Sequence, residues 1–191
     1  MIYIHVINLF RFFLKIIIYS IVVLGSPLFL ANYYFQRYRL INFLSMLFSG
    51  LPDEVQSPQI NKIMDDVYGK NHSELIETAL YELKEEGYWV NLSIDWRDID
   101  EVEPQANEVI KYTCIQDTFT LSTQSDDESV WQALVTFDIW LQARGYQFVL
   151  WDQGSDQYEG FVCDSPSCEK FMKLGNRFGL KLIELDHVNE Q

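Results

Sequence analysis

The chain has 191 residues, 48% of them hydrophobic and 15% aromatic, and this is enough to bury one sizeable core. Its formal net charge is −14. Because residues 1–50 hold four basic and no acidic side chains, residues 51–191 carry 10 basic against 28 acidic ones, a charge of −18. Such an excess of acid repels phosphate backbones, which argues against nucleic-acid binding and favours a basic protein partner or a metal ion. Excess acid also keeps a protein dispersed without any partner.

Residues 1–50 are predicted to be an apolar, helical N-terminal extension to an acidic domain of residues 51–191. No charged side chain occurs in residues 16–36, and at about 1.5 Å per residue a helix of this length crosses a bilayer core. The segment therefore predicts a membrane anchor. Two other interpretations remain open. One is a cleaved signal peptide, and the other is an over-extended reading frame, with translation starting near Met46 and a cytoplasmic product.

Two amphipathic helices are predicted at the start of the acidic domain. Ser57 and Pro58 suit the N-cap and first position of a helix that continues to Gly69. The tetrad from Asn71 to Glu74 resembles a capping box, and the helix it begins is expected to end at Gly87. That second helix should bury the apolar residues that recur at helical spacing, which are Ile76, Ala79, Leu80 and Leu83.

A strand is predicted from Tyr88 to Trp96, because apolar and polar residues alternate there. Tyr88, Val90, Leu92, Ile94 and Trp96 are expected on its dry face. A helix should then begin at Pro104, and a short strand should cover residues 118–121.

The middle of the chain predicts a strongly apolar helix. Ser125 to Glu128 has the spacing of a capping box, and Gly145 suits the left-handed position after a helix end. The helix has an apolar stripe that covers more than half of its circumference, formed by Val130, Trp131, Leu134, Val135, Phe137, Ile139, Trp140 and Leu141. A helix of this kind must be covered on most sides.

The C-terminal third predicts a hairpin, a helix and a last strand. Strands from Tyr146 and from Gln157 flank the polar loop 153–156. Asp164 to Pro166 then suits a helix start, and a strand over residues 180–185 precedes a tail expected to fray. The predicted fold class is α+β, a two-layer sandwich with helices on one face of a mostly antiparallel or mixed sheet.

Several short motifs resemble an uncharacterised bacterial family known only as a domain of unknown function. They are Gly87-Tyr88, Gly145-Tyr146, the run from Trp151 to Tyr158, and Gly179-Leu180. The resemblance covers about residues 73–186. Because no reaction is assigned to that family, the resemblance implies no catalytic residues.

The best candidate site is acidic. Asp95, Asp152 and Asp156 are predicted to meet at one end of the sheet, where carboxylate oxygens suit a hard cation. Tyr158, from the same hairpin motif, completes the predicted binding set. The alternative is that these aspartates only stabilise turns through local hydrogen bonds.

The sequence contains no recognisable catalytic set, and we expect neither a resident metal nor a cofactor. Cys114, Cys163 and Cys168 lack metal-ligand spacing, and a Cys163–Cys168 disulfide remains open if the protein is exported. Two functional hypotheses follow. The first is a non-enzymatic module that binds a protein, such as an immunity-type inhibitor or regulator. The second is a metal-dependent hydrolase that uses the aspartate cluster.

Overall fold

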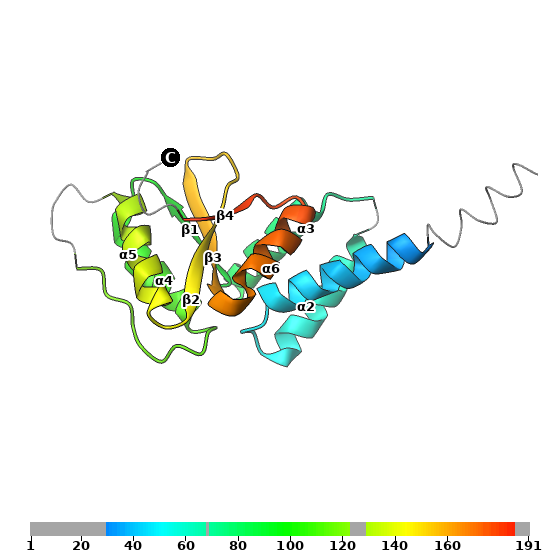
Figure 1. Cartoon of the computed structure of the whole chain (residues 1–191), viewed down its shortest axis with the longest axis horizontal. Helices are drawn as coiled ribbons and strands as arrows, with labels where there is room; N and C mark the ends of the chain where they lie inside the picture. The colour runs from blue at the N-terminus through cyan, green and yellow to red at the C-terminus, as the bar shows by residue number, and fades with distance from the viewer. Residues whose placement is uncertain (1–29, 68, 123–128, 186–191) are drawn as a thin grey trace, which may run out of the picture. The chain divides into compact units, whose positions relative to one another are not determined.

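The computed structural model describes residues 30–67, 69–122 and 129–185 (Figure 1). Part of the predicted anchor, residues 16–29, lies outside the described residues, as do the predicted capping box of residues 125–128 and the tail from residue 186. None of the helices in the described ranges combines the length and apolarity needed to cross a membrane. The chain divides into two compact units, Met1–Arg39 and Leu40–Gln191.

In the first unit, residues 30–39 are helical. The Arg39 guanidinium lies 3.7 Å from the centroid of the Phe35 ring, a cation–π contact within one helical turn. The second unit contains the sheet and the remaining helices.

Four antiparallel strands form the sheet of the second unit, in the order β1-β3-β2-β4. They are β1 (Asn91–Asp95), β2 (Tyr146–Trp151), β3 (Gln157–Asp164) and β4 (Leu182–Glu184). The predicted hairpin is confirmed, with Tyr146 opposite Asp164 and Trp151 opposite Glu159. The α+β class is therefore as expected, and the sheet is antiparallel.

Helices cover both faces of the sheet, so there are three layers where two were predicted (Figure 1). One face shares its apolar core with α2 (Asp53–Asp66), α3 (His72–Glu85) and α6 (Ser165–Arg177), and α2 packs on α3. The other face shares its core with α4 (Val102–Ile110) and α5 (Val130–Gln142). The cause lies in β2. Phe148 and Leu150 belong to the α4–α5 core, whereas Val149 and Trp151 belong to the other. A central strand that is apolar on both faces needs cover on both.

Residues 40–47 are helical and belong to the core of the second unit. Phe43 and Leu44 are completely buried, and the Phe43 ring lies 5.2 Å from that of Phe171 in α6. The compact unit thus begins at Leu40, ahead of the domain boundary predicted at residue 51. The apolar composition around residue 45 therefore serves the folded domain.

Helix α2 begins earlier than predicted. Its N-cap is Pro52, and the backbone N–H groups of Val55 and Gln56 both bond to the Pro52 carbonyl. Pro58 lies inside the helix, so the pair Ser57-Pro58 was the wrong start signal. Two acidic side chains in the first turn, Asp53 and Glu54, favour the observed start because they complement the helix dipole.

The strand predicted over residues 118–121 is wrong. Side chains of α4 take the place of a partner strand: Asn107 bonds to both the N–H and the C=O of Phe119, each at 2.9 Å. Glu103 Oε2 accepts the N–H of Leu121 at 2.7 Å. Helix α4 itself begins at Val102, so Pro104 lies inside its first turn. Phe119 is buried against Phe137 although it belongs to no strand.

The central helix has the predicted core but a different cap. Ser129 is the N-cap and forms a capping box with Gln132, whereas the sequence predicted a capping box that begins at Ser125. Its core positions Leu134 and Phe137 are completely buried, whereas Ile139 is 55% exposed, so the covered stripe is narrower than predicted. Asp138, only 3% exposed, accepts the N–H of Phe148 at 2.6 Å and thereby extends the hydrogen bonding of β2 beyond the end of β4.

Candidate functional site

The four predicted site residues lie at the same end of the sheet. Asp95 ends β1 opposite Gln157, and Tyr158 lies opposite Ile94. Asp152 follows β2 directly, and Asp156 precedes β3. The hairpin loop 153–156 connects these two strands at this end.

Two of the aspartates stabilise turns. Asp95 Oδ1 accepts the backbone N–H of Arg97 at 3.0 Å, and Asp152 Oδ1 accepts that of Gly154 at 3.0 Å. Gly154 has a φ of +68°, which a side chain would strain, so the loop depends on glycine there. Lys181 Nζ lies 3.9 Å from Asp152 Oδ2 on the surface. The local hydrogen bonds are those expected from turn aspartates.

Tyr158 serves as a packing residue. Its ring is half-buried, and its centroid lies 5.8 Å from that of Trp131 in α5. Across the described ranges, no group of three or more His, Cys, Asp or Glu side chains is arranged to hold a metal ion.

Trp96 was expected on the dry face of β1 but is 50% exposed. The strand ends at Asp95, and the Asp98 N–H bonds back to the Asp95 carbonyl at 2.9 Å, so the alternation stops before Trp96. The backbone N–H of Trp96 donates to the Asp156 carbonyl at 3.3 Å, which holds the backbone of Trp96 beside the hairpin loop. The Arg97 guanidinium lies 4.5 Å from the centroid of the ring. The exposure of Trp96, which lies beside acidic turn residues, is therefore a feature that the alternating sequence pattern did not predict.

Glu159 and Lys84 form a partly buried polar pair near the same end, and sequence reasoning missed both. Burial raises the pKa of Glu159, with Glu77 adding to the rise and Lys84 opposing it. Burial likewise lowers the pKa of Lys84, whose ammonium lies 4.2 Å from the centroid of the Trp89 ring. The missed signal was Glu159 itself, a charged residue at an inward position of a central strand.

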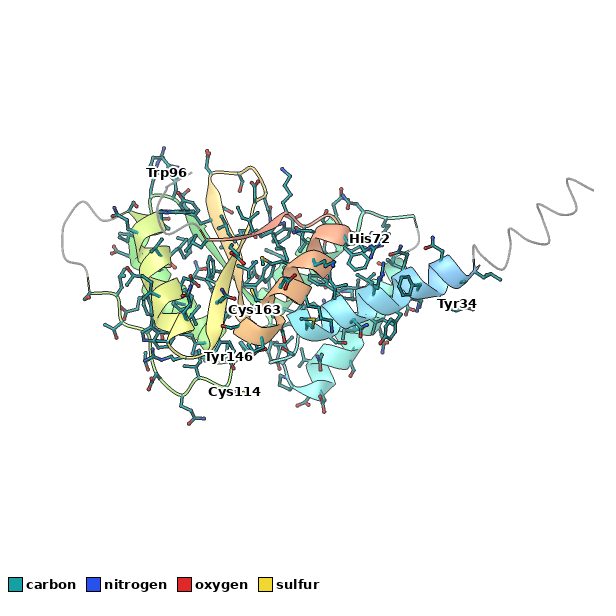
Figure 2. The ribbon with its side chains drawn as sticks, viewed as in Figure 1. Tyr34, His72, Trp96, Cys114, Tyr146 and Cys163 are labelled. Carbon is teal, nitrogen blue, oxygen red and sulfur yellow. The ribbon has the colours of Figure 1, made fainter. Side chains whose placement is uncertain are left out.

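The opposite end of the sheet contains a groove of about 630 Å³. Its walls come from helical residues of the 40–47 segment, the loop after α4, the end of β3 and the start of α6. Figure 2 shows Cys114 and Tyr146 at this end and Trp96 at the other. A neighbouring hollow of about 610 Å³ shares the residues Cys114, Tyr146 and Asp164 with the groove.

Tyr146 connects the α4–α5 loop to the sheet. Its hydroxyl oxygen accepts the Cys114 N–H at 3.1 Å, and burial raises the pKa of the phenol. Cys114 is exposed, so the groove presents one accessible thiol.

All three cysteines are free, and two of them form a buried pair. The hydrogen bond between the thiols raises the pKa of Cys163 and lowers that of Cys168, and burial adds to the first effect and opposes the second. Cys163 also lines the groove. The structure therefore has Cys163 and Cys168 as neighbouring thiols.

Comparison with known proteins gives one match. The sequence model of a family described as a domain of unknown function, DUF6630, covers residues 44–186. This range includes both ends of the sheet and extends the expected resemblance from residue 73 back to residue 44. No curated protein and no solved structure matches the chain.

Proposed function

We propose a non-enzymatic function for this chain, which belongs to the DUF6630 family of domains of unknown function. The domain is an acidic protein-interaction module that binds a basic partner, as an immunity-type inhibitor or regulator does. Its binding surface is the hairpin-end surface, defined here by Asp95, Trp96, Asp98, Asp152 and Asp156.

The exposed indole of Trp96 carries this proposal. Tryptophan is enriched among the few residues that dominate the binding energy of protein interfaces. Trp96 is 50% exposed, whereas Trp131 and Trp151 are only 4% and 5% exposed. The backbone of Trp96 is also fixed by the hydrogen bond from its backbone N–H to the Asp156 carbonyl. A backbone that is fixed before binding loses less conformational freedom when a partner covers it.

Charge supports a basic partner. Residues 51–191 have a formal charge of −18, and four of the five residues of the hairpin-end surface are aspartates. Complementary charge accelerates encounter and selects the partner, and its contribution falls as salt rises. The local hydrogen bonds of Asp95 and Asp152 orient their carboxylates, and Lys181 Nζ lies 3.9 Å from Asp152 Oδ2.

Photo-crosslinking followed by binding measurements tests the proposal. A photoreactive amino acid at position 96 should capture a partner that the same group at Tyr81, an aromatic residue of α3 with 66% exposure, does not capture. The purified partner should then bind Trp96→Ala about 10- to 30-fold more weakly than the unchanged chain. Tyr81→Ala should bind normally. Binding that ignores both Trp96→Ala and salt would contradict the proposal.

The metal-dependent hydrolase is the second candidate. Asp95, Asp152 and Asp156 lie at the same sheet end, which favours it, but within the described ranges they are not grouped closely enough to hold a metal ion. Titration of Mg²⁺, Mn²⁺ and Ca²⁺ against melting temperature distinguishes the two functions. A bound ion at 100 times its dissociation constant adds about 2.7 kcal/mol of stability. No shift with any of the three ions would exclude the hydrolase.

A further inference from the structure

The described part of the first unit, residues 30–39, is a helix that exposes large apolar side chains. Tyr34 is 65% exposed and Tyr38 is 62% exposed, and Leu30 and Phe35 also have about half of their surface in solvent. A contiguous group of exposed apolar side chains marks an interaction surface, whereas single ones do not. We define these four residues as the aromatic stripe.

The aromatic stripe occupies one side of its helix, with an arginine near each edge. At about 100° of rotation per residue, its four side chains fall within an arc of about 140°. Arg37 and Arg39 fall within about 40° of the two edges of that arc. The Arg39 guanidinium lies 3.7 Å from the centroid of the Phe35 ring, so one positive charge directly borders the stripe.

Charge distinguishes this helix from the acidic domain. Residues 1–50 hold four basic and no acidic side chains, whereas residues 51–191 carry −18. Anionic lipid headgroups attract the former and repel the latter. Residues 16–29, which precede the stripe in the sequence, contain no charged side chain. An uncharged run followed by aromatic and basic residues is typical of a chain that meets the boundary between acyl chains and headgroups.

The helix of residues 30–39 is too short to cross a bilayer. At about 1.5 Å per residue it extends about 15 Å, which is about half the thickness of the hydrocarbon core. A stripe of aromatic rings between two arginines suits a helix that lies at the lipid–water interface. Tyrosine rings and arginine stems contact the acyl region there, while their polar ends remain in water.

We propose that the aromatic stripe binds the headgroup region of an anionic lipid bilayer, with Arg37 and Arg39 contacting the lipid phosphates. The rings of Tyr34 and Tyr38 lie below the phosphates. This binding goes beyond the anchor predicted for residues 16–36, because an anchor needs only apolar length, whereas the stripe distinguishes anionic from neutral lipid. It is also independent of the hairpin-end surface, whose residues belong to the second unit.

Quenching of a fluorescent label by lipid tests this binding directly. The label is attached to Tyr38→Cys in the full-length chain, with the exposed thiol removed by Cys114→Ser. The chain is reconstituted into vesicles made from equal parts of phosphatidylcholine and phosphatidylglycerol. Lipid brominated near its headgroup should quench the label at position 38, and aqueous iodide should not. The same label at Tyr81→Cys, an exposed position of α3, should be quenched by iodide only.

The two quenchers distinguish what covers position 38. Quenching by iodide as strong as at position 81 would place the stripe in water, even if the chain is held on the vesicle by residues before Leu30, and would overturn the proposal. Protection from both quenchers would mean that a protein surface, such as a second copy of the chain, covers the stripe, and would overturn it as well. Tyr34→Cys provides the same measurement if Tyr38→Cys fails to fold.

Brominated phosphatidylglycerol and brominated phosphatidylcholine, compared at equal amounts, measure the role of the arginines. The anionic lipid should quench the label at position 38 at least about twofold more strongly, because each basic side chain near the surface attracts anionic lipid. Arg37→Gln combined with Arg39→Gln should remove that preference. Lys70→Gln combined with Lys173→Gln removes the same charge from exposed positions of the second unit and should leave it unchanged. A preference that persists in the arginine variant would contradict the proposal.

Discussion

The two ends of the sheet differ in the surface that they present to solvent. At the hairpin end, the loop closes on itself: Asp152 bonds to Gly154, Asp95 bonds to Arg97, and Trp96 bonds to Asp156. At the groove end, β1 begins at Asn91, opposite Phe161, and residues from several parts of the chain line a groove of about 630 Å³. The hairpin end is thus an acidic surface that presents the exposed Trp96 side chain, whereas the groove end is hollowed.

The groove end depends most on helical residues 40–47, and removal of this segment should have the largest effect. A chain that starts at Met46 lacks Leu40, Phe43 and Leu44, each of which is buried. Losing large core side chains costs about 2–5 kcal/mol each, and three such losses approach the whole stability of a typical domain. We expect this truncation to be largely unfolded by circular dichroism, whereas a chain that starts at residue 40 should fold. A well-folded product from Met46 would contradict the role assigned to the segment.

Alanine substitution of two tryptophans near the hairpin end, one buried and one exposed, should change the free energy of unfolding by different amounts. Trp131 is 4% exposed and packs on Tyr158, so Trp131→Ala should lower the free energy of unfolding by about 3–5 kcal/mol. Trp96→Ala should change it by less than about 0.5 kcal/mol, because its indole is half in solvent. Urea denaturation of both variants measures the difference. Equal losses would mean that Trp96 is a core residue and that the hairpin end has no exposed anchor.

Asp138 extends the hydrogen bonding of β2 toward the groove end. Asp138→Ala leaves the buried Phe148 N–H without its acceptor, and we expect a loss of about 1–3 kcal/mol. Asp138→Asn retains an acceptor oxygen and should lose less. Thermal unfolding of the two variants measures the effect, and equal losses would show that this hydrogen bond contributes nothing specific.

Glu159 provides a pH test near the hairpin end. Its pKa is raised by burial, so the protonated form favours the folded state; that contribution is present below the unfolded pKa near 4.5 and is lost as pH rises through the folded pKa. Glu159→Gln should therefore raise stability at pH 7, by less than about 1 kcal/mol because solvent reaches the carboxylate, and should change little at pH 4. Melting curves at the two pH values test this. A stabilisation that is equal at both would rule out titration of Glu159 as its cause.

Much of the fold followed from local patterns. The N-cap Asn71, the left-handed glycines 87 and 145, and the hairpin after Trp151 all lie where spacing and turn chemistry predicted. These features depend on neighbouring residues, which a single sequence contains.

The errors share one cause, which is that contacts between distant residues override local pattern. The Asn107 side chain, 12 positions away in the sequence, forms both hydrogen bonds to the backbone of Phe119. The local pattern around Phe119 does not contain this contact, so it predicted a strand there. The second helical layer covers the sheet because β2 is apolar on both faces. A short run of apolar residues has no clear periodicity, so it does not show by itself that both faces of the strand are covered.

For the candidate site, too, the local features were predicted and the features that depend on distant contacts were missed. The sequence predicted Asp95, Asp152, Asp156 and Tyr158 at one sheet end because strand ends and turns are locally encoded. It missed the exposure of Trp96, which depends on a strand ending one residue earlier. It also missed the groove, which is built from five separate stretches of the chain.

Chemical-shift mapping by NMR with the partner captured at position 96 tests the central claim most directly. The account predicts that the largest backbone shift changes fall on Asp95, Trp96 and Asp98 and on the loop 153–156, and that they shrink as salt is raised. Shift changes concentrated on α3 around Tyr81, or spread evenly over the domain, would contradict an acidic module that binds through its hairpin end.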